Sequence, residues 1–486
     1  MRKVACSVIV FFACFLFYTE SAKADYTSGT YPDTLSIEAL SQKHKGNYLR
    51  IGNIIIIGNK KTKPQIILRE LDIKQGDYIY SEDLPEILEL DRNKIYNLRL
   101  FNTVLIRTIE VDAGIIDILI EVSERWFFFP VPLFELADRN FNDWWQNQNH
   151  DLSRLNYGVK LYYNNVRGRN ESLRLTLQGG FLRNMEVIYR IPYLDKKQQH
   201  GISFGFNYSE TKNLPYTTVD HIQQFLRTDN LIRKSTGGFL GYTYRKNFYE
   251  FHSVLFDFRN FEAADTIIAL NDTYFSEGNT FQRMPSITYQ YNRDKRDIAA
   301  YPLKGYQFFG HISRTGFGFK NEINRIDLSV SYSKFIDLKN GNYFSNFSYL
   351  YLSTPNEQPY FSYAALGYKR LFVRGYELYL IEGPQIAMNK TTFKKRIFSG
   401  SWFIDAMPFE QFKHLPIAIF LKTYVDFGYV TMYPNYQQDY FLNNRLLTGT
   451  GIGLDFVSSY DSVLRLEYSF TSLGTGGFFF HVKREF

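Results

Sequence analysis

"GISFGFNY", residues 201–208, alternates small or polar residues with bulky apolar ones at every step. In an extended strand, Ile202, Phe204, Phe206 and Tyr208 fall on one face, and Ser203, Gly205 and Asn207 fall on the other. The same period of two recurs in "SLRLTLQGG" (172–180), "GIGLDF" (451–456) and "VLRLEYSF" (463–470). Such strands suit a β-barrel with lipid outside and a polar lumen inside, although a soluble β-sandwich would show the same alternation.

Composition and charge exclude several other classes of protein. The 486 residues are 22% charged and 18% aromatic, and no run of about 18–20 apolar residues follows the first 20 positions, so a helical membrane protein is excluded. The net charge of +7 is too small and too dispersed to indicate a nucleic-acid partner. Cys6 and Cys14 are the only cysteines, which excludes disulfides and cysteine-based zinc sites from residue 15 onward.

The N-terminus is typical of a secretory signal peptide. Arg2 and Lys3 precede the apolar run "VACSVIVFFACFLFY", and the small residues Ala22 and Ala24 precede a cleavage point. We expect a signal peptide over 1–24 and a linker over 25–48. The alternatives are a retained anchor helix and a lipoprotein cut at Cys14.

Residues 49–125 predict a small α+β domain with the order β-α-α-β-β. "IGNIIIIG" (51–58) is a strand ended by Gly58, and a first helix is broken at Gly76. A second helix follows, and then "TVLIRTIEV" (103–111) and "IIDILIEV" (115–122) flank a turn as a hairpin. This order resembles a POTRA domain, the periplasmic module of the Omp85 superfamily. The alternative is an unrelated small α+β domain.

A second match to that superfamily lies far along the chain. "VRGY" (Val373, Arg374, Gly375, Tyr376) resembles the tetrad at the tip of the long sixth extracellular loop of Omp85 barrels, and "FLKTYVDFGYV" (420–430) resembles their "F.DxG" strand. The resemblance implies that the loop folds into the lumen and that Arg374 contacts Asp426, with Gly428 on the same face. The alternative is a chance tetrapeptide on an exposed loop. For a second acidic partner of Arg374, the sequence offers Asp405 as a candidate.

A hairpin motif adds to this resemblance. "YNRDKRDIAAYPLKGY" (291–306) is similar to the "D.RD…P..G" hairpin of Omp85 barrels, with its members in register: Asp294, Arg296, Asp297, Pro302 and Gly305. The resemblance implies that residues 126–486 form one antiparallel transmembrane β-barrel of about 16 strands. The predicted fold is therefore mainly β, with a POTRA domain at 49–125 before the barrel.

The first and last barrel strands carry residues that weaken strand pairing. Pro130 and Pro132 lie in the expected first strand, near 127–137, and proline has no N–H to donate. Gly474, Gly476 and Gly477 stand at the start of the expected last strand. We expect a seam between these strands that can open sideways into lipid. The alternative is that the prolines merely precede the first strand.

These features predict function as well as fold. The resemblance implies an outer-membrane protein, with its POTRA domain in the periplasm, that assists insertion of client proteins into the outer membrane or their translocation across it. The expected partners are unfolded outer-membrane or secreted clients and outer-membrane lipid. The alternative is a passive pore or structural barrel. No nucleophile elbow, H-E-x-x-H motif or P-loop occurs, and no two histidines have ligand spacing, so we expect no enzyme, cofactor or metal site.

Overall fold

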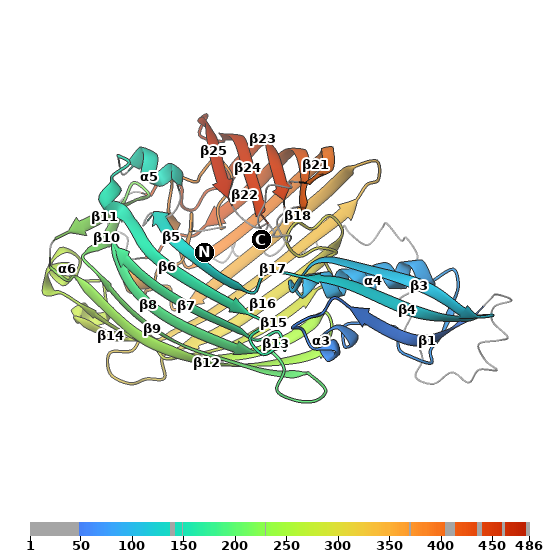
Figure 1. The fold of residues 1–486 in the computed structure, drawn as a ribbon. Coiled ribbons are helices and arrows are strands. Elements are labelled where there is room, and N and C mark those ends of the chain that lie inside the picture. Colours follow the sequence, from blue (N-terminus) through green and yellow to red (C-terminus); the bar gives the residue numbers. More distant parts are fainter. Residues whose placement is uncertain are drawn as a thin grey trace. The chain divides into compact units, whose positions relative to one another are not determined.

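The computed structural model describes residues 48–136, 141–147, 149–228, 230–368, 371–403, 414–434, 440–458 and 462–482 (Figure 1). The predicted signal peptide, nearly all of the predicted linker and the candidate Asp405 lie outside the described residues. None of the described helices is long and apolar enough to cross a membrane.

The N-terminal domain is an α+β unit with a four-stranded sheet of order β2-β1-β4-β3. Its elements are β1 (Tyr48–Ile57), α3 (Pro64–Leu68), β2 (Tyr78–Tyr80), α4 (Leu84–Asn97), β3 (Phe101–Asp112) and β4 (Ile115–Glu124). The short β2 was not predicted. It forms because the Gly76 N–H donates to the Ile51 carbonyl and the Ile51 N–H donates to the Asp77 carbonyl, which holds the chain after Gly76 against β1.

A closed barrel follows and confirms the predicted mainly-β fold. Among the described residues, 17 strand segments make the ring, but β14 and β15 both pair with β13, so the ring has 16 strand positions (17 − 1). The segments are β5 (Phe128–Leu136), β6 (Leu155–Asn164), β7 (Ser172–Gly180), β8 (Leu182–Ile191), β9 (His200–Thr211), β12 (Arg233–Asn247), β13 (Glu250–Ala263), β14 (Phe281–Arg283), β15 (Ser286–Asp294), β16 (Gly305–Thr315), β17 (Arg325–Asp337), β18 (Asn342–Thr354), β21 (Gln385–Phe403), β22 (His414–Val430), β23 (Leu447–Ser458), β24 (Ser462–Thr471) and β25 (Gly476–Val482). The neighbours of β5 in the ring are β6 and β25.

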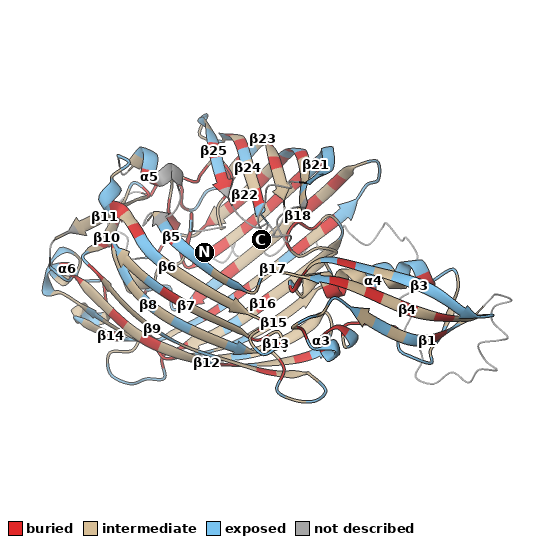
Figure 2. Cartoon of the chain, viewed as in Figure 1, coloured by how far each residue is buried: buried red, intermediate tan, exposed pale blue. Residues whose placement is uncertain are grey.

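The two faces of the barrel wall differ as the period of two requires. On β22, Lys422 and Asp426 are buried inside, whereas Leu421 points outward and is 44% exposed. Large apolar side chains on the outer face of other strands are also exposed, for example Phe206 and Ile452. Figure 2 shows the resulting alternation of buried and exposed residues along the strands. The outer face therefore suits lipid and the inner face carries the polar groups.

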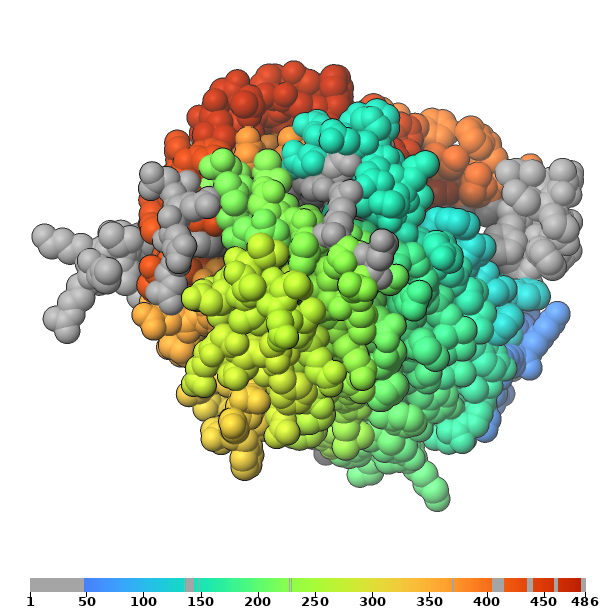
Figure 3. Space-filling view, turned by 90° about the vertical axis from the view of Figure 1, so that its left-hand side faces the viewer, coloured from blue at the N-terminus to red at the C-terminus, as the bar shows by residue number. Residues whose placement is uncertain are grey.

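Several short elements lie in the sequence between the barrel strands. They are the hairpin β10 (Asn213–Val219) and β11 (Ile222–Arg227), the helices α5 (Phe141–Asn147) and α6 (Asp265–Leu270), and the 3-10 turns Leu152–Arg154, Ser276–Gly278 and Tyr360–Ser362. Leu214 of the hairpin, Ile267 of α6, and Tyr274 and Phe275 are buried together in one apolar cluster. Figure 3 shows the face on which the residues of the hairpin and of α6 gather.

Candidate functional site: a loop clasped inside the barrel

The loop between β18 and β21 packs against the inner wall of the barrel. It contains two short strands that pair with each other, β19 (Ala365–Leu366) and β20 (Ile381–Glu382). Val373 and Tyr376 at its tip are each only 1% exposed. They belong to one apolar cluster with wall residues that include Met388, Val430 and Leu447. The tip of the loop is therefore part of the barrel interior.

Arg374 meets the carboxylate that the sequence predicted. Its Nε lies 2.8 Å from Asp426 Oδ2, and its Nη2 lies 2.5 Å from Asp426 Oδ1, so the guanidinium and carboxylate planes bond at two points. The Arg374 backbone N–H also donates to Asp426 Oδ2 (3.1 Å). The guanidinium carbon lies 3.8 Å from the centre of the Tyr424 ring, and Nη2 donates to Thr392 Oγ1 (3.0 Å). Arg374 is thus held by β21, β22 and its own backbone.

Glycines make room for this contact on both sides. Gly375 has a φ of +95°, a conformation that side-chain-bearing residues rarely adopt, so it sets the turn at the loop tip. On the wall, a Cβ at Gly428 would lie 2.5 Å from Val373 Cγ2, and a Cβ at Gly449 would lie 1.9 Å from the Arg374 carbonyl oxygen. The loop tip therefore rests directly on the backbones of β22 and β23.

Sequence reasoning missed the second acidic group near Arg374. Glu467 on β24 lies with Oε1 3.7 Å from Arg374 Nη1 and 2.8 Å from Lys422 Nζ, and its side chain is 3% exposed. The available signal was its position opposite Leu466 in the alternating strand "VLRLEYSF", which indicates a lumen-facing side chain.

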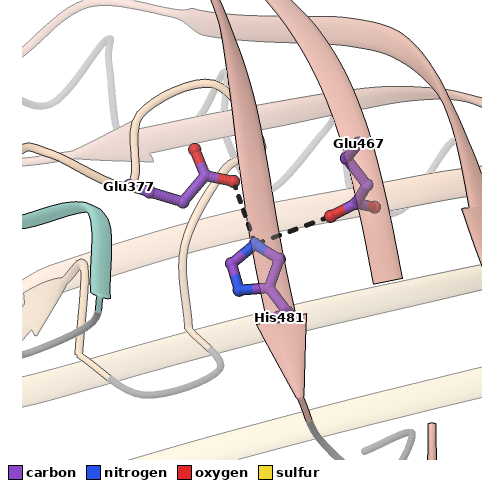
Figure 4. A group of neighbouring side chains, drawn as sticks. All are labelled: Glu377, Glu467 and His481. Atoms are coloured by element: carbon purple, nitrogen blue, oxygen red, sulfur yellow. Dashed lines mark ion pairs between the residues drawn. The ribbon is translucent and has the colours of Figure 1, made fainter. Parts of the chain in front are cut away.

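A further contact ties the loop to the last barrel strand (Figure 4). His481 on β25 lies with Nε2 3.6 Å from Glu377 Oε1 on the loop and 3.6 Å from Glu467 Oε2 on β24. The second oxygen of Glu377 accepts the Gly375 N–H (2.7 Å), and the Phe372 ring stacks on the imidazole.

The same three residues have the chemistry of a cation site. Their ligand atoms lie within 4.8 Å of one another. However, Lys422 and Arg374 already neutralise Glu467, so this triad serves as a link between loop and wall rather than as a metal site.

The predicted hairpin residues lie together at the β15–β16 turn. Asp294 ends β15 and accepts two hydrogen bonds from the Arg296 guanidinium, at 2.8 Å from Nε and 2.6 Å from Nη2. The carboxylate of Asp297 accepts the Leu303 N–H, next to Pro302. Gly305 begins β16 with a φ of +103°. These contacts stabilise the β15–β16 turn.

The predicted seam residues lie in two segments. Pro130 and Pro132 are both inside β5, opposite Leu161 and Val159 of β6. Gly474 lies in the turn before β25, with a φ of +76°, and Gly476 and Gly477 are the first two residues of β25.

Outside the barrel wall, His221 joins three loops. It occupies the β10–β11 turn, is fully buried, and lies with Nδ1 3.2 Å from the Leu380 carbonyl oxygen of the clasped loop. Its Nε2 accepts the Leu442 N–H (3.1 Å) from the segment before β23. Burial lowers the pKa of His221 to about 4. The neutral ring, with a proton on Nδ1, is therefore the form that fits this site.

This arrangement predicts an acid-sensitive loop contact. Because the folded pKa is about 4 and the unfolded value is about 6.5, the unfolded state binds more protons between these pH values, and stability should fall as the pH drops through that window. His221→Asn should flatten this part of the stability–pH curve. The measurement is the difference in melting temperature between wild type and variant from pH 7.5 to pH 4. A constant difference across this range would contradict the prediction.

Comparison with known proteins agrees with this architecture. The family model "POTRA: Surface antigen variable number repeat" matches residues 49–125. CdiB from Escherichia coli has a similar fold, with a TM-score of 0.53 at 12% identity over 90% of this chain and 76% of that chain.

Two other solved structures have lower TM-scores. BamA from Haemophilus ducreyi lacking POTRA domains 1-3 has a TM-score of 0.47 at 14% identity over 90% and 82% of the two chains. CdiB from Acinetobacter baumannii has 0.48 at 13% over 90% and 74%. No curated protein matches the sequence significantly. The chain therefore carries a segment that matches the POTRA family model, at residues 49–125, followed by a closed β-barrel whose fold is similar to that of CdiB from Escherichia coli.

Proposed function

We propose that this chain is an outer-membrane protein that assists client proteins to insert into the outer membrane or to cross it. The observation that carries the proposal is the combination of a POTRA domain with a closed barrel whose long loop is clasped inside by Arg374 and Asp426. The exposed apolar outer face supports a location in the bacterial outer membrane, with the POTRA domain in the periplasm. A passive pore would need neither the POTRA domain nor the clasped loop.

The POTRA sheet has an edge suited to capturing an extended client segment. In the sheet order β2-β1-β4-β3, the edge strands are β2, with 3 residues, and β3, with 12. Leu105 and Ile109 share one face of β3, and these two residues and Val111 are each at least 45% exposed. An edge strand offers unpaired N–H and C=O groups that a client strand can bond, while apolar side chains beside it add contact area. We infer that β3 is the capture edge.

The geometry of β5 supports the proposed seam. Phe128 faces Tyr163 of β6, and the preceding residue, Phe127, accepts the Asn164 N–H through its carbonyl oxygen (2.8 Å). Phe127 therefore directs its backbone groups toward β6. Along an antiparallel strand, successive residues direct their backbone groups to opposite neighbours. Even-numbered residues of β5 therefore direct theirs away from β6, toward β25. Pro130 and Pro132 are both even-numbered, so two ladder donors are missing on the β25 side.

A disulfide across the seam should therefore abolish client handling. Phe134→Cys, combined in turn with Phe478→Cys and Phe480→Cys, places thiols on outward-facing side chains of β5 and β25. Cross-linking under oxidising conditions should block activity, and reduction should restore it. The control is Phe134→Cys with Tyr157→Cys, which locks β5 to β6, a pair with a complete ladder. Full activity of a protein locked between β5 and β25 would refute the seam.

Depletion followed by outer-membrane proteomics tests the function itself. Loss of a group of barrel proteins would indicate insertion, and loss of one secreted protein would indicate translocation. An unchanged outer-membrane proteome, together with a steady ion conductance of the purified barrel in planar bilayers, would favour the passive pore instead.

A further inference from the structure

A small cavity of about 40 Å³ lies beside Arg374 in the barrel interior. This volume is the space open to the centre of a water molecule, of which one water needs about 10–15 Å³. The cavity therefore has the size of about three waters or one small oxyanion. Phe372 from the clasped loop and the hydroxyl-bearing residues Ser345 and Thr392 contribute to its lining. The charged residues that line it are Arg374, Lys390, Lys394, Lys422, Arg465 and Glu467.

The charged residues that line this cavity are mainly cationic. Five of the lining residues are cationic and one is a carboxylate. Three more carboxylates are buried nearby: Asp426 on Arg374, Asp455 on Lys422, and Glu377 beside His481. Among the described residues, each of these three carboxylates already contacts a cation or His481. A buried charge is expensive unless a counter-charge and hydrogen bonds accompany it.

Lys390 differs from its cationic neighbours because it has no ion pair among the described residues. Lys390 is 8% exposed, and its Nζ makes no hydrogen bond or ion pair with any described residue. The contact that it does make is with the Phe372 ring, whose centre lies 4.1 Å from Nζ. By contrast, Arg374 and Lys422 contact carboxylates at 2.5 Å, and Arg465 Nε lies 3.7 Å from Asp455 Oδ1. The ammonium group of Lys390 and the nearby hydroxyl groups can all donate hydrogen bonds to an anion in the cavity.

We propose that this cavity binds a small oxyanion such as inorganic phosphate, held by Lys390 with help from Ser345 and Thr392. Phe372 and Arg374 belong to the loop, so the site is complete only while the loop is inside the barrel. A ligand that binds one conformation alone shifts the equilibrium toward it. The bound anion therefore stabilises the clasped state of the loop, independently of which client the protein handles.

The test uses the full mature chain folded in a non-ionic detergent. Inorganic phosphate is titrated by calorimetry, and the melting midpoint is followed by the loss of the compact band on gels, with sodium chloride at equal ionic strength as the reference. Phosphate should bind and should raise the midpoint of wild type. Lys390→Met should weaken this binding by at least an order of magnitude. The matched control is Lys395→Met, which alters an exposed lysine on the same strand and should bind phosphate like wild type.

Other outcomes decide against the proposal. Equal effects of chloride and phosphate would indicate ionic strength alone, and phosphate binding that survives in Lys390→Met would place the anion elsewhere. Glycerol 3-phosphate serves as a larger probe, and binding as tight as that of phosphate would indicate an open surface site. If Lys390→Met does not fold, Ser345→Ala replaces it and should weaken phosphate binding while leaving the melting midpoint in chloride unchanged. Undiminished binding in that variant would equally overturn the proposal.

Discussion

Arg374→Ala should lower the unfolding free energy of the barrel by about 3–5 kcal/mol, the range observed when one partner of a buried ion pair is removed. The reason is that Asp426, which is fully buried, would lose both guanidinium bonds and keep an uncompensated charge. Urea unfolding in detergent, followed by intrinsic fluorescence, measures the change. Asp426→Ala should cost a similar amount, because it leaves the Arg374 guanidinium without its two-point partner.

The double variant separates a specific pair from general damage. If Arg374 and Asp426 stabilise the fold through each other, Arg374→Ala with Asp426→Ala should cost clearly less than the sum of the single changes. Arg374→Lys should be intermediate, because an ammonium keeps the charge but cannot match the carboxylate at two points. The control pair is Arg183 and Glu210, which are 3.8 Å apart with the Arg183 side chain 66% exposed, and should couple by less than about 1 kcal/mol. Simple additivity at Arg374 and Asp426 would show that the pair is not coupled.

Much of the fold could be predicted from local sequence patterns. A period of two predicted strands such as β7, β9, β23 and β24, because a half-buried strand must alternate. The pairing of Arg374 with Asp426 could also be anticipated, because each belongs to a motif of its own and the alternation around Asp426 directs it inward. The POTRA domain is recognisable for a similar reason, since its helices and strands each have their own period.

Features that depend on distant contacts could not be anticipated in the same way. His481, Glu377 and Glu467 come from β25, the loop and β24, and no spacing in the sequence relates them. The short β2 depends on backbone bonds to Ile51 rather than on its own three side chains. The number of strands, about 16, could be estimated from length, but the separate segment β14, which shares its partner β13 with β15, could not. The sideways opening of the seam stays a prediction.

Gly449→Ala should destabilise the clasped loop by about 2–3 kcal/mol, toward the upper end of the cost of overpacking a core. The new Cβ would lie 1.9 Å from the Arg374 carbonyl oxygen and 3.3 Å from Val373 Cγ1. A backbone oxygen cannot rotate away as a side chain can, so the whole loop tip has to withdraw from β23. That withdrawal would lengthen the bonds between Arg374 and Asp426. The change in urea unfolding free energy and the rate of protease cleavage in the loop measure the effect.

Two comparisons make this prediction specific to the loop. Gly310→Ala on β16 is the matched control, because a Cβ there has its nearest neighbour at an ordinary 3.6 Å, and it should cost much less. In an Arg374→Ala background, Gly449→Ala should also cost less than it does in wild type, because the tip would already be released from its main bond. Faster cleavage in Gly449→Ala alone would show that the loop occupies the barrel interior in solution. Equal costs for Gly449→Ala and Gly310→Ala would mean that the loop tip does not contact β23 in solution. The pairing of Arg374 with Asp426 could not then support the proposed function.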